Sequence, residues 1–291
     1  MHLGNVFSAL LAWLSVRAAG GELLLRVEDL DPDRSRPEYV QLLREDLQWL
    51  GLTWDRETQP QSERAEIYAA QFRKLEQTGL VYPCYCSRAA LHAASAPHAA
   101  DGQLIYAGTC RHLTPAQRAV QKKPPAWRLQ VPDRVYGFTD GLQGPYTENL
   151  AADCGDFIIR RADGVYAYQL AVVTDDALSG VTQVVRGQDL LSSTPRQLYL
   201  YALLDLTPPA FYHVPLLLAP DGRRLSKRDR DLDLGQLRRR TGPEQILGLL
   251  ACLAGLRPAP APVTAEELAA DFSWSRVRRQ NVVLDMRMLS F

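Results

Sequence analysis

Apolar residues near the start of the chain recur every three or four positions and then give way to an almost continuous apolar run. The helical spacing predicts an amphipathic helix over residues 4–18, which ends near a pair of glycines. Residues 22–27 have the pattern of a strand that is buried on both faces. A helix followed by such a strand predicts an α/β fold with a doubly wound parallel sheet, whose ligands sit at the carboxyl ends of the strands.

Helical apolar spacing recurs further along the chain. Residues 37–50 and 61–79 predict helices that cover the sheet or belong to an insertion. Hydroxyl residues at 192–194 offer amino-terminal caps for another helix. Residues 246–253 predict an apolar helix, which a proline-alanine linker at 258–262 follows.

Alternating apolar and polar residues predict strands in the middle of the chain. Residues 126–131 and 135–140 read as two paired strands linked by a turn at 132–134. Residues 156–161 and 164–168 read as a hairpin around an alanine-aspartate-glycine turn.

Charge is balanced overall but not locally. The 291 residues contain 33 lysines and arginines and 33 aspartates and glutamates, so net charge indicates no polyanionic partner. Residues 223–240 hold eight basic and three acidic residues, a patch that favours phosphates; a solvated helix face is the alternative. The basic residues are Arg223, Arg224, Lys227, Arg228, Arg230, Arg238, Arg239 and Arg240.

The apolar runs are too short to span a membrane, and the first helix lacks a basic leader and a cleavage site. Five cysteines, an odd number, fit a reducing compartment better than a disulfide framework. We therefore expect a cytoplasmic protein with no membrane partner.

Two segments far apart in the chain carry groups suited to a polyphosphate. At the start of the first helix, His2 can donate to an oxygen with developing charge, and Gly4 lets a nucleotide approach free backbone N–H groups. Residues 223–228 form a basic loop in which Ser226 is a donor and Lys227 a compact charge. Taken alone, such a loop is more commonly an exposed turn.

Together, the His-Leu-Gly-Asn and Arg-Leu-Ser-Lys segments resemble the paired signature of class I aminoacyl-tRNA synthetases. The resemblance implies a Rossmann-like fold and ATP as a substrate with Mg²⁺. It implies catalytic roles for His2 and Lys227. The ATP-binding residues that it implies are His2, Gly4, Asn5, Leu225, Ser226 and Lys227.

Two further segments resemble the substrate pocket of glutamyl-tRNA synthetases. Residues 26–31, Arg-Val-Glu-Asp-Leu-Asp, are similar to the family's Arg-Ile-Glu-Asp-Thr-Asp, which implies that Glu28 binds the amino group of L-glutamate; a solvated acidic turn is the alternative. Tyr168 and Arg186 match the family's glutamate-holding tyrosine and arginine. Arginine can clasp a carboxylate through two hydrogen bonds. A packed tyrosine and an arginine paired with Asp189 are the alternatives.

Three cysteines have spacing that a metal site could use. Cys84 and Cys86 are separated by one residue, and Cys110 follows 24 residues after Cys86. This spacing fits a zinc site about as well as it fits free thiols. It leaves the fourth ligand open among His92, His98 and His112.

The cysteine pattern, with Tyr106 before Cys110, resembles the insertion of glutamyl-Q tRNA(Asp) synthetases, a shortened branch of the glutamyl-tRNA synthetases. That resemblance implies one structural zinc ion per chain, with Cys84, Cys86, Tyr106 and Cys110 as ligands. Only 51 residues follow Arg240, which is too few for the anticodon-binding region of a full glutamyl-tRNA synthetase.

The resemblance divides the chain into four expected parts. These are residues 1–80, the first half of the nucleotide-binding fold; 81–125, the zinc-binding insertion; 126–218, the second half with the substrate pocket; and 219–291, the basic loop and a short helical tail.

The resemblance implies that a monomer activates glutamate as an adenylate and transfers it to queuosine at the wobble position of tRNA(Asp). A core that charges the end of a tRNA and a non-catalytic tRNA-binding relative are the alternatives. In the family, an Arg-Phe-Ala-Pro-Ser-Pro-Thr-Gly segment precedes the His-Leu-Gly-Asn element, whereas this chain begins at Met1-His2. We expect the upstream reading frame to encode that strand.

Overall fold

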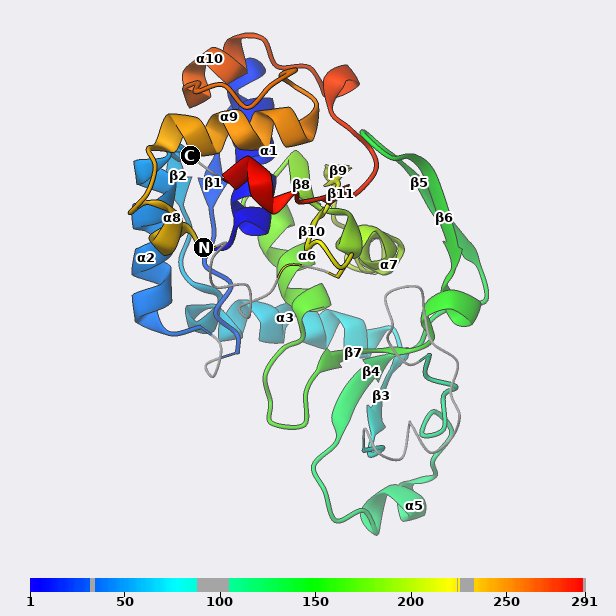
Figure 1. The fold of residues 1–291 in the computed structure, drawn as a ribbon. Helices are drawn as coiled ribbons and strands as arrows, with labels where there is room; N and C mark the ends of the chain where they lie inside the picture. The colour runs from blue at the N-terminus through cyan, green and yellow to red at the C-terminus, as the bar shows by residue number, and fades with distance from the viewer. Residues whose placement is uncertain (32–34, 88–104, 224, 226–232, 290–291) are drawn as a thin grey trace.

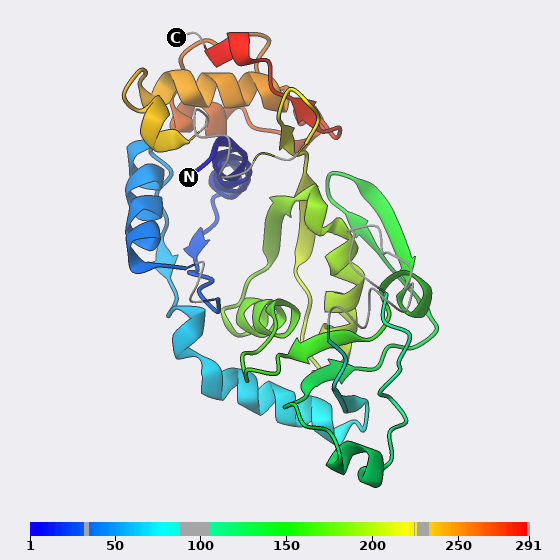
Figure 2. The same ribbon diagram turned by 60° about the horizontal axis from the view of Figure 1, so that its bottom comes forward.

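Helix α1 (Leu3–Ala18) lies at the centre of the largest of the three hydrophobic clusters in the described residues, and it confirms the helix predicted over residues 4–18. The computed structural model describes residues 1–31, 35–87, 105–223, 225 and 233–289 (Figure 1). Buried side chains run along α1 from Leu3 to Ser15. They pack with α2 (Pro37–Trp49), α9 (Pro243–Ala254) and α10 (Ala265–Ala270), which surround α1 in Figure 2.

The second core joins α3 (Ala65–Gln77), α6 (Tyr168–Leu178) and α7 (Thr194–Leu203) to the neighbouring strands. The predicted helices of residues 37–50, 61–79 and 246–253 are confirmed by α2, α3 and α9. The remaining helices are short: α5 (Pro115–Ala119), α8 (Leu234–Leu237), the 3-10 turns η1 (Gln61–Glu63), η3 (Gln188–Ser193), η5 (Trp274–Arg276) and η6 (Met286–Leu289), and the π turn η2 (Leu150–Cys154).

Parallel strands occur in the described residues as three separate pairs and not as one doubly wound sheet. They are β1 (Leu24–Leu25) with β2 (Arg56–Glu57), β8 (Gln183–Gly187) with β9 (Ala210–Val214), and β10 (Leu217–Leu218) with β11 (Val282–Val283). The prediction of a single sheet is therefore not met in this part of the chain. Leu25 and Val185 pack against the core that contains α1, so apolar contacts and not one hydrogen-bond ladder hold the first two pairs together.

Antiparallel strands form a separate sheet at the end of the molecule away from α9 and α10, and a hairpin that runs alongside β9 (Figure 1). The sheet has the order β3 (Val81–Cys84), β4 (Ala126–Leu129) and β7 (Phe157–Arg160). The hairpin joins β5 (Val135–Asp140) to β6 (Gly144–Asn149).

One of the two predicted pairings in this region is wrong. Residues 126–131 do not pair with 135–140, because β3 and β7 occupy both edges of β4 and β5 pairs with β6 across its own turn. The hairpin predicted for residues 156–161 and 164–168 is confirmed in a shorter form: Arg160 and Tyr166 form an antiparallel bridge, and the backbone N–H of Arg161 donates to the carbonyl oxygen of Val165 at 2.8 Å. Its second arm is short because Tyr168 already begins α6.

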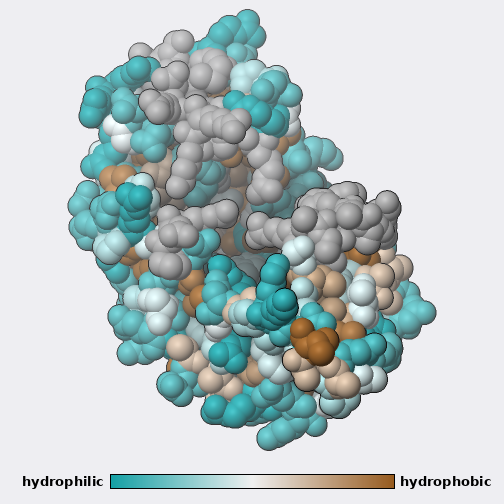
Figure 3. All heavy atoms as spheres, turned by 90° about the horizontal axis from the view of Figure 1, so that it is seen from below, coloured by the Kyte–Doolittle hydropathy of each residue, from teal (hydrophilic) through white to brown (hydrophobic). Residues whose placement is uncertain are grey.

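Seen from below, the molecule is hollowed near the middle of the face, and hydrophilic residues lie along the lower rim of the hollow (Figure 3). A search of the described helices finds no segment with the length and hydrophobicity that a bilayer crossing demands.

Candidate active site

The amino end of α1 and the residue before Ser226 line the same cavity, which has a volume of about 400 Å³. His2 immediately precedes α1, and Gly4 and Asn5 lie in its first turn. The cavity is lined by Met1, His2, Gly4, Asn5, Ser8, Gly187, Asp189, Leu216, Leu217 and Leu225. Two segments more than 200 residues apart in the sequence therefore meet at the start of a helix, where backbone N–H groups favour an anion.

Gly4 is needed for the close fit of the His2 ring. A Cβ atom at position 4 would lie 3.2 Å from Nδ1 and Cε1 of His2 and 3.9 Å from Cδ1 of Leu225. A methyl group at position 4 would therefore require the imidazole to shift by a few tenths of an ångström. Ser226 and Lys227, predicted to bind ATP beside His2, lie outside the described residues.

Arg26 connects the predicted Glu28 to helix α6. Its Nη1 donates to Oδ1 of Asp176 at 2.6 Å, and its Nη2 donates to Oε1 of Glu28 at 3.0 Å. Burial opposes the charge of Arg26, but Asp176 and Glu28 outweigh that effect and raise its pKa. Glu28 is thus an exposed carboxylate with a buried cation as its partner, and its binding role stays a prediction.

Tyr168, the first residue of α6, lies within electrostatic reach of the other two predicted glutamate-binding residues. Burial raises its pKa, the positive charge of Arg186 opposes that shift, and the negative charge of Glu28 adds to it. The fold thus gathers a carboxylate, a phenol and a guanidinium from three distant segments, although their binding roles stay predictions.

Arg186, on β8, is held by buried polar groups. Its Nη2 donates to Oγ1 of Thr194 at 2.9 Å and to Oε1 of Gln197 at 2.8 Å. Its Nε donates to Nε2 of His213 at 3.0 Å. These contacts fix Arg186 in a buried polar network, and its role in binding glutamate stays a prediction.

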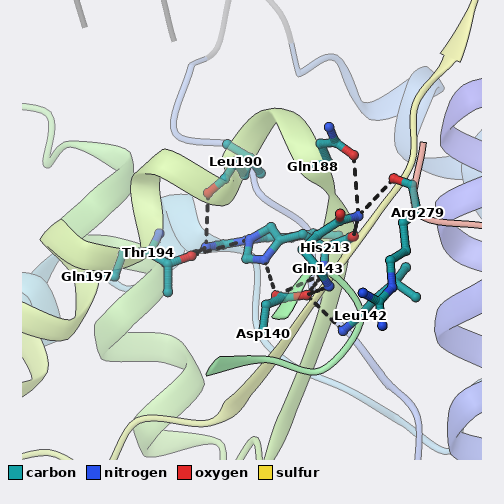
Figure 4. Close-up of polar contacts among 10 residues, drawn as sticks. Asp140, Leu142, Gln143, Gln188, Leu190, Thr194, Gln197, His213 and Arg279 are labelled. Atoms are coloured by element: carbon teal, nitrogen blue, oxygen red, sulfur yellow. Dashed lines mark hydrogen bonds and ion pairs between the residues drawn. The ribbon is translucent and has the colours of Figure 1, made fainter. Parts of the chain in front are cut away.

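His213 and Asp140 complete this network, and sequence reasoning missed both. Nδ1 of His213 lies 2.5 Å from Oδ2 of Asp140, and both side chains are fully buried (Figure 4). Arg186 and His213 are direct register partners of the parallel strands β8 and β9. A histidine inside the apolar strand of residues 210–214 was the available signal, but its partner depends on a register that the sequence does not state.

The three cysteines predicted to bind zinc lie together at the insertion. Their sulfur atoms all lie within 4.8 Å of one another. Sγ of Cys86 is 3.6 Å from Sγ of Cys110, and the hydroxyl of Tyr106 is 3.4 Å from Sγ of Cys84 and 3.8 Å from Sγ of Cys86. Tetrahedral zinc with bonds of about 2.3 Å to sulfur would separate two sulfurs by about 3.8 Å, so this donor set fits the ion.

Tyr106 is fixed from two further sides. The backbone N–H of Cys110 donates to its hydroxyl oxygen at 2.8 Å, and the guanidinium of Arg128 stacks 3.9 Å from its ring centre. Burial raises the pKa of the Cys86 thiol to about 11. Among the open fourth ligands, His112 is exposed and outside the cysteine cluster, and His92 and His98 lie outside the described residues.

The basic segment 223–240 is only partly a free surface. Arg238 donates to Oδ1 of the buried Asp46 at 3.2 Å and lies 5.0 Å from the ring centre of Trp49. It stabilises the fold and is not a candidate for phosphate binding. Arg239 and Arg240 are exposed, and Arg224, Lys227, Arg228 and Arg230 lie outside the described residues.

Comparison with known proteins identifies relatives along the whole chain. A family model described as "tRNA synthetases class I (E and Q), catalytic domain" matches residues 1–291. A glutamyl-Q tRNA(Asp) synthetase from Symbiobacterium thermophilum is 49% identical, over 97% of this chain and 91% of the relative. One from Nocardia farcinica is 47% identical, over 98% of this chain and 89% of the relative.

The fold has solved counterparts. A glutamate tRNA ligase from Elizabethkingia meningosepticum, crystallised in complex with its amino acid, superposes with a TM-score of 0.83 at 25% identity. A glutamate-tRNA synthetase from Elizabethkingia anophelis gives 0.84, also at 25%. Each superposition covers 99% of this chain but only 65% and 66% of the respective ligase, so this chain spans less than two thirds of their length.

Proposed function

This chain belongs to the class I tRNA synthetases for glutamate and glutamine, and within them to the glutamyl-Q tRNA(Asp) synthetases, and on that basis we propose that it attaches glutamate to queuosine in tRNA(Asp) at the expense of ATP. The observation that carries the proposal is the proximity of the three predicted glutamate-binding residues: Arg26 joins Glu28 to Asp176 on α6, and Tyr168, which begins α6, lies within electrostatic range of Glu28 and Arg186. Glutamate carries one ammonium and two carboxylates. The carboxylate of Glu28 can bind the ammonium, and the guanidinium of Arg186 can bind a carboxylate.

In the first step, an oxygen of the glutamate α-carboxylate attacks the α-phosphorus of ATP. The new oxygen–phosphorus bond replaces the bond to the β-phosphate, and pyrophosphate leaves with Mg²⁺. The protein positions the reactants and stabilises charge, without a covalent intermediate on the enzyme. His2 and Lys227 would stabilise the developing charge, and Gly4, Asn5, Leu225 and Ser226 would line the nucleotide site. The shared cavity of His2 and Leu225 supports this assignment.

In the second step, a hydroxyl oxygen of the cyclopentenediol ring of queuosine attacks the activated carbonyl carbon. An ester bond forms, AMP leaves, and the hydroxyl proton goes to solvent or to the departing phosphate. The exposed Arg239 and Arg240, which belong to the basic segment 223–240, would contact the tRNA backbone.

We propose that Cys84, Cys86, Tyr106 and Cys110 hold one structural zinc ion, which would crosslink the segments of the insertion when bound. The spacing of the four donor atoms supports this ligand set. The division into residues 1–80, 81–125, 126–218 and 219–291, the Rossmann-like relation between the halves, a monomeric state and a cytoplasmic location belong to the same proposal.

Two assays test the function. Glutamate-dependent exchange of pyrophosphate into ATP tests activation, with glutamine and aspartate as controls. Radiolabelled glutamate is then offered to tRNA(Asp) with and without queuosine. We expect label on queuosine-containing tRNA alone; label at the terminal ribose of unmodified tRNA would instead identify a tRNA-charging enzyme. Absence of exchange with all three amino acids would favour a non-catalytic relative.

A further inference from the structure

The guanidinium of Arg186 is oriented on two sides by buried acceptors. Thr194 and Gln197, both from α7, accept from Nη2, and His213, from β9, accepts from Nε. In the described part of the chain Nη1 has no hydrogen-bond partner, so its N–H groups remain for a ligand. The direction in which Arg186 offers those groups is set by the atoms that hold Nε and Nη2.

His213 can accept from Arg186 only as one tautomer. Asp140 is a carboxylate whose Oδ1 already accepts from the backbone N–H groups of Leu142 and Gln143, at 2.9 and 2.8 Å. Its Oδ2 lies 2.5 Å from Nδ1 of His213, and a carboxylate oxygen accepts, so Nδ1 must carry the proton. Nε2 is then unprotonated and presents its lone pair to Nε of Arg186.

The electrostatic surroundings keep His213 neutral and Asp140 charged. Burial lowers the pKa of His213, Asp140 opposes that shift, and the charge of Arg186 adds to it, with Asp189 as a further negative neighbour. Burial would raise the pKa of Asp140, but its hydrogen bonds from His213 and the backbone outweigh burial and lower it.

The pair is also anchored to the rest of the molecule. The side-chain amide of Gln143 donates to the carbonyl oxygens of His213, at 2.8 Å, and Arg279, at 3.2 Å (Figure 4). The turn after β5 thus ties Asp140 to β9 and to the C-terminal segment, which limits the movement of the imidazole.

We propose that His213, with its tautomer set by Asp140, is a positioning residue that aims Arg186 at a carboxylate of the substrate glutamate. The inference rests on the proposed function, because it assumes that Arg186 binds that carboxylate. His213 itself does not touch the substrate. Its contribution is to remove the rotational freedom of a long cation before the substrate arrives, which lowers the entropic cost of binding.

Asp140→Asn tests the tautomer with almost no change in shape. The backbone donors of Leu142 and Gln143 keep the amide oxygen at the Oδ1 position, so the amide NH₂ faces Nδ1 of His213. The proton of His213 must then move to Nε2, where it points at the N–H of Arg186. Two donors face each other, and Arg186 loses its fixed direction.

His213→Leu removes the acceptor, and His213→Gln is the conservative variant, since an amide can donate to Asp140 and accept from Arg186 together. Asp156→Asn is the matched control. Asp156 is an equally buried carboxylate, and it accepts from the backbone N–H of Val131 at 2.9 Å. In the described residues it contacts neither Arg186 nor the side chains that hold Arg186.

In pyrophosphate exchange, we expect Asp140→Asn and His213→Leu to raise the KM for glutamate about tenfold, as the loss of a hydrogen bond to a charged group does, with the KM for ATP unchanged. His213→Gln should recover most of the loss, and Asp156→Asn should leave the KM for glutamate unchanged. The inference is overturned if Asp140→Asn leaves the KM for glutamate unchanged, or if it raises the KM for ATP by the same factor. It is also overturned if the KM for glutamate is as high in His213→Gln as in His213→Leu.

Nitrogen-15 NMR of the His213 imidazole gives a second readout that needs neither activity nor a variant that folds. We expect protonated Nδ1 and unprotonated Nε2 in the wild-type protein, and a proton on Nε2 overturns the inference by itself. Absence of exchange in the wild type would refute the proposed function instead. Exchange in the wild type together with a normal Asp140→Asn variant would refute only the positioning role.

Discussion

Replacing Arg26 by methionine should destabilise the fold by about 3–5 kcal/mol, the usual cost of leaving a buried charge without its partner. Arg26 bonds to Asp176 and to Glu28, but the two contacts differ in weight. The side chain of Asp176 is only 6% exposed, whereas that of Glu28 is 40% exposed. An exposed ion pair contributes about 0–1 kcal/mol, so nearly all of the loss should come from the buried carboxylates, Asp176 and also Asp175, whose Oδ2 lies 4.0 Å from Nε of Arg26.

Urea denaturation followed by circular dichroism measures the loss as a lower midpoint at an unchanged slope. In thermal unfolding the same loss should lower Tm by roughly 10 °C, at about 2–4 °C for each kcal/mol in a chain of this order of size. Glu28→Gln is the matched control, because it removes the exposed contact alone and should cost less than about 1 kcal/mol.

The double variant Arg26→Met/Asp176→Asn isolates the stranded carboxylate. Removing that charge should restore about 1–3 kcal/mol relative to Arg26→Met, as coupled neighbours do. If Arg26→Met cost less than about 1 kcal/mol, or if Asp176→Asn added its own loss without recovery, Arg26 would not be the internal counterion that its contacts indicate.

Three other outcomes are expected. Gly4→Ala should lower the rate of pyrophosphate exchange about tenfold or more at unchanged Tm, because its Cβ would displace the His2 ring; an unchanged rate would contradict the close fit. Cys86→Ser should lose the bound zinc measured by mass spectrometry and lower Tm, whereas Cys252→Ser should retain one equivalent; equal zinc in both would exclude the cysteine cluster. The free energy of unfolding should fall as pH drops below about 6.5, because the pKa of His213 is lowered in the folded protein and the unfolded chain then binds one more proton. His213→Gln should flatten this dependence on pH; equal slopes in the variant and the wild type would contradict a neutral His213.

Local periodicity predicted the helices well because a helix is specified by neighbours in sequence. The apolar positions that predicted a helix over residues 4–18 are the residues that α1 buries. Strand pairing was predicted less well, because it depends on which edge is available. Residues 126–131 have the pattern of a strand, but nothing in that pattern shows that β3 and β7 would take both edges of β4.

The same distinction separates the parts of the candidate site. Glu28, Arg186 and the cysteines were found because each belongs to a short motif that can be read without the fold. Asp140 and His213 belong to no such motif, and their chemistry arises only when β9 pairs with β8 in a register that sets His213 against Arg186. A buried ionisable side chain is costly without a partner. His213, in an otherwise apolar strand, therefore required polar partners elsewhere in the chain. The fold supplies Asp140, about 70 residues earlier in the sequence, and Arg186, about 30 residues earlier.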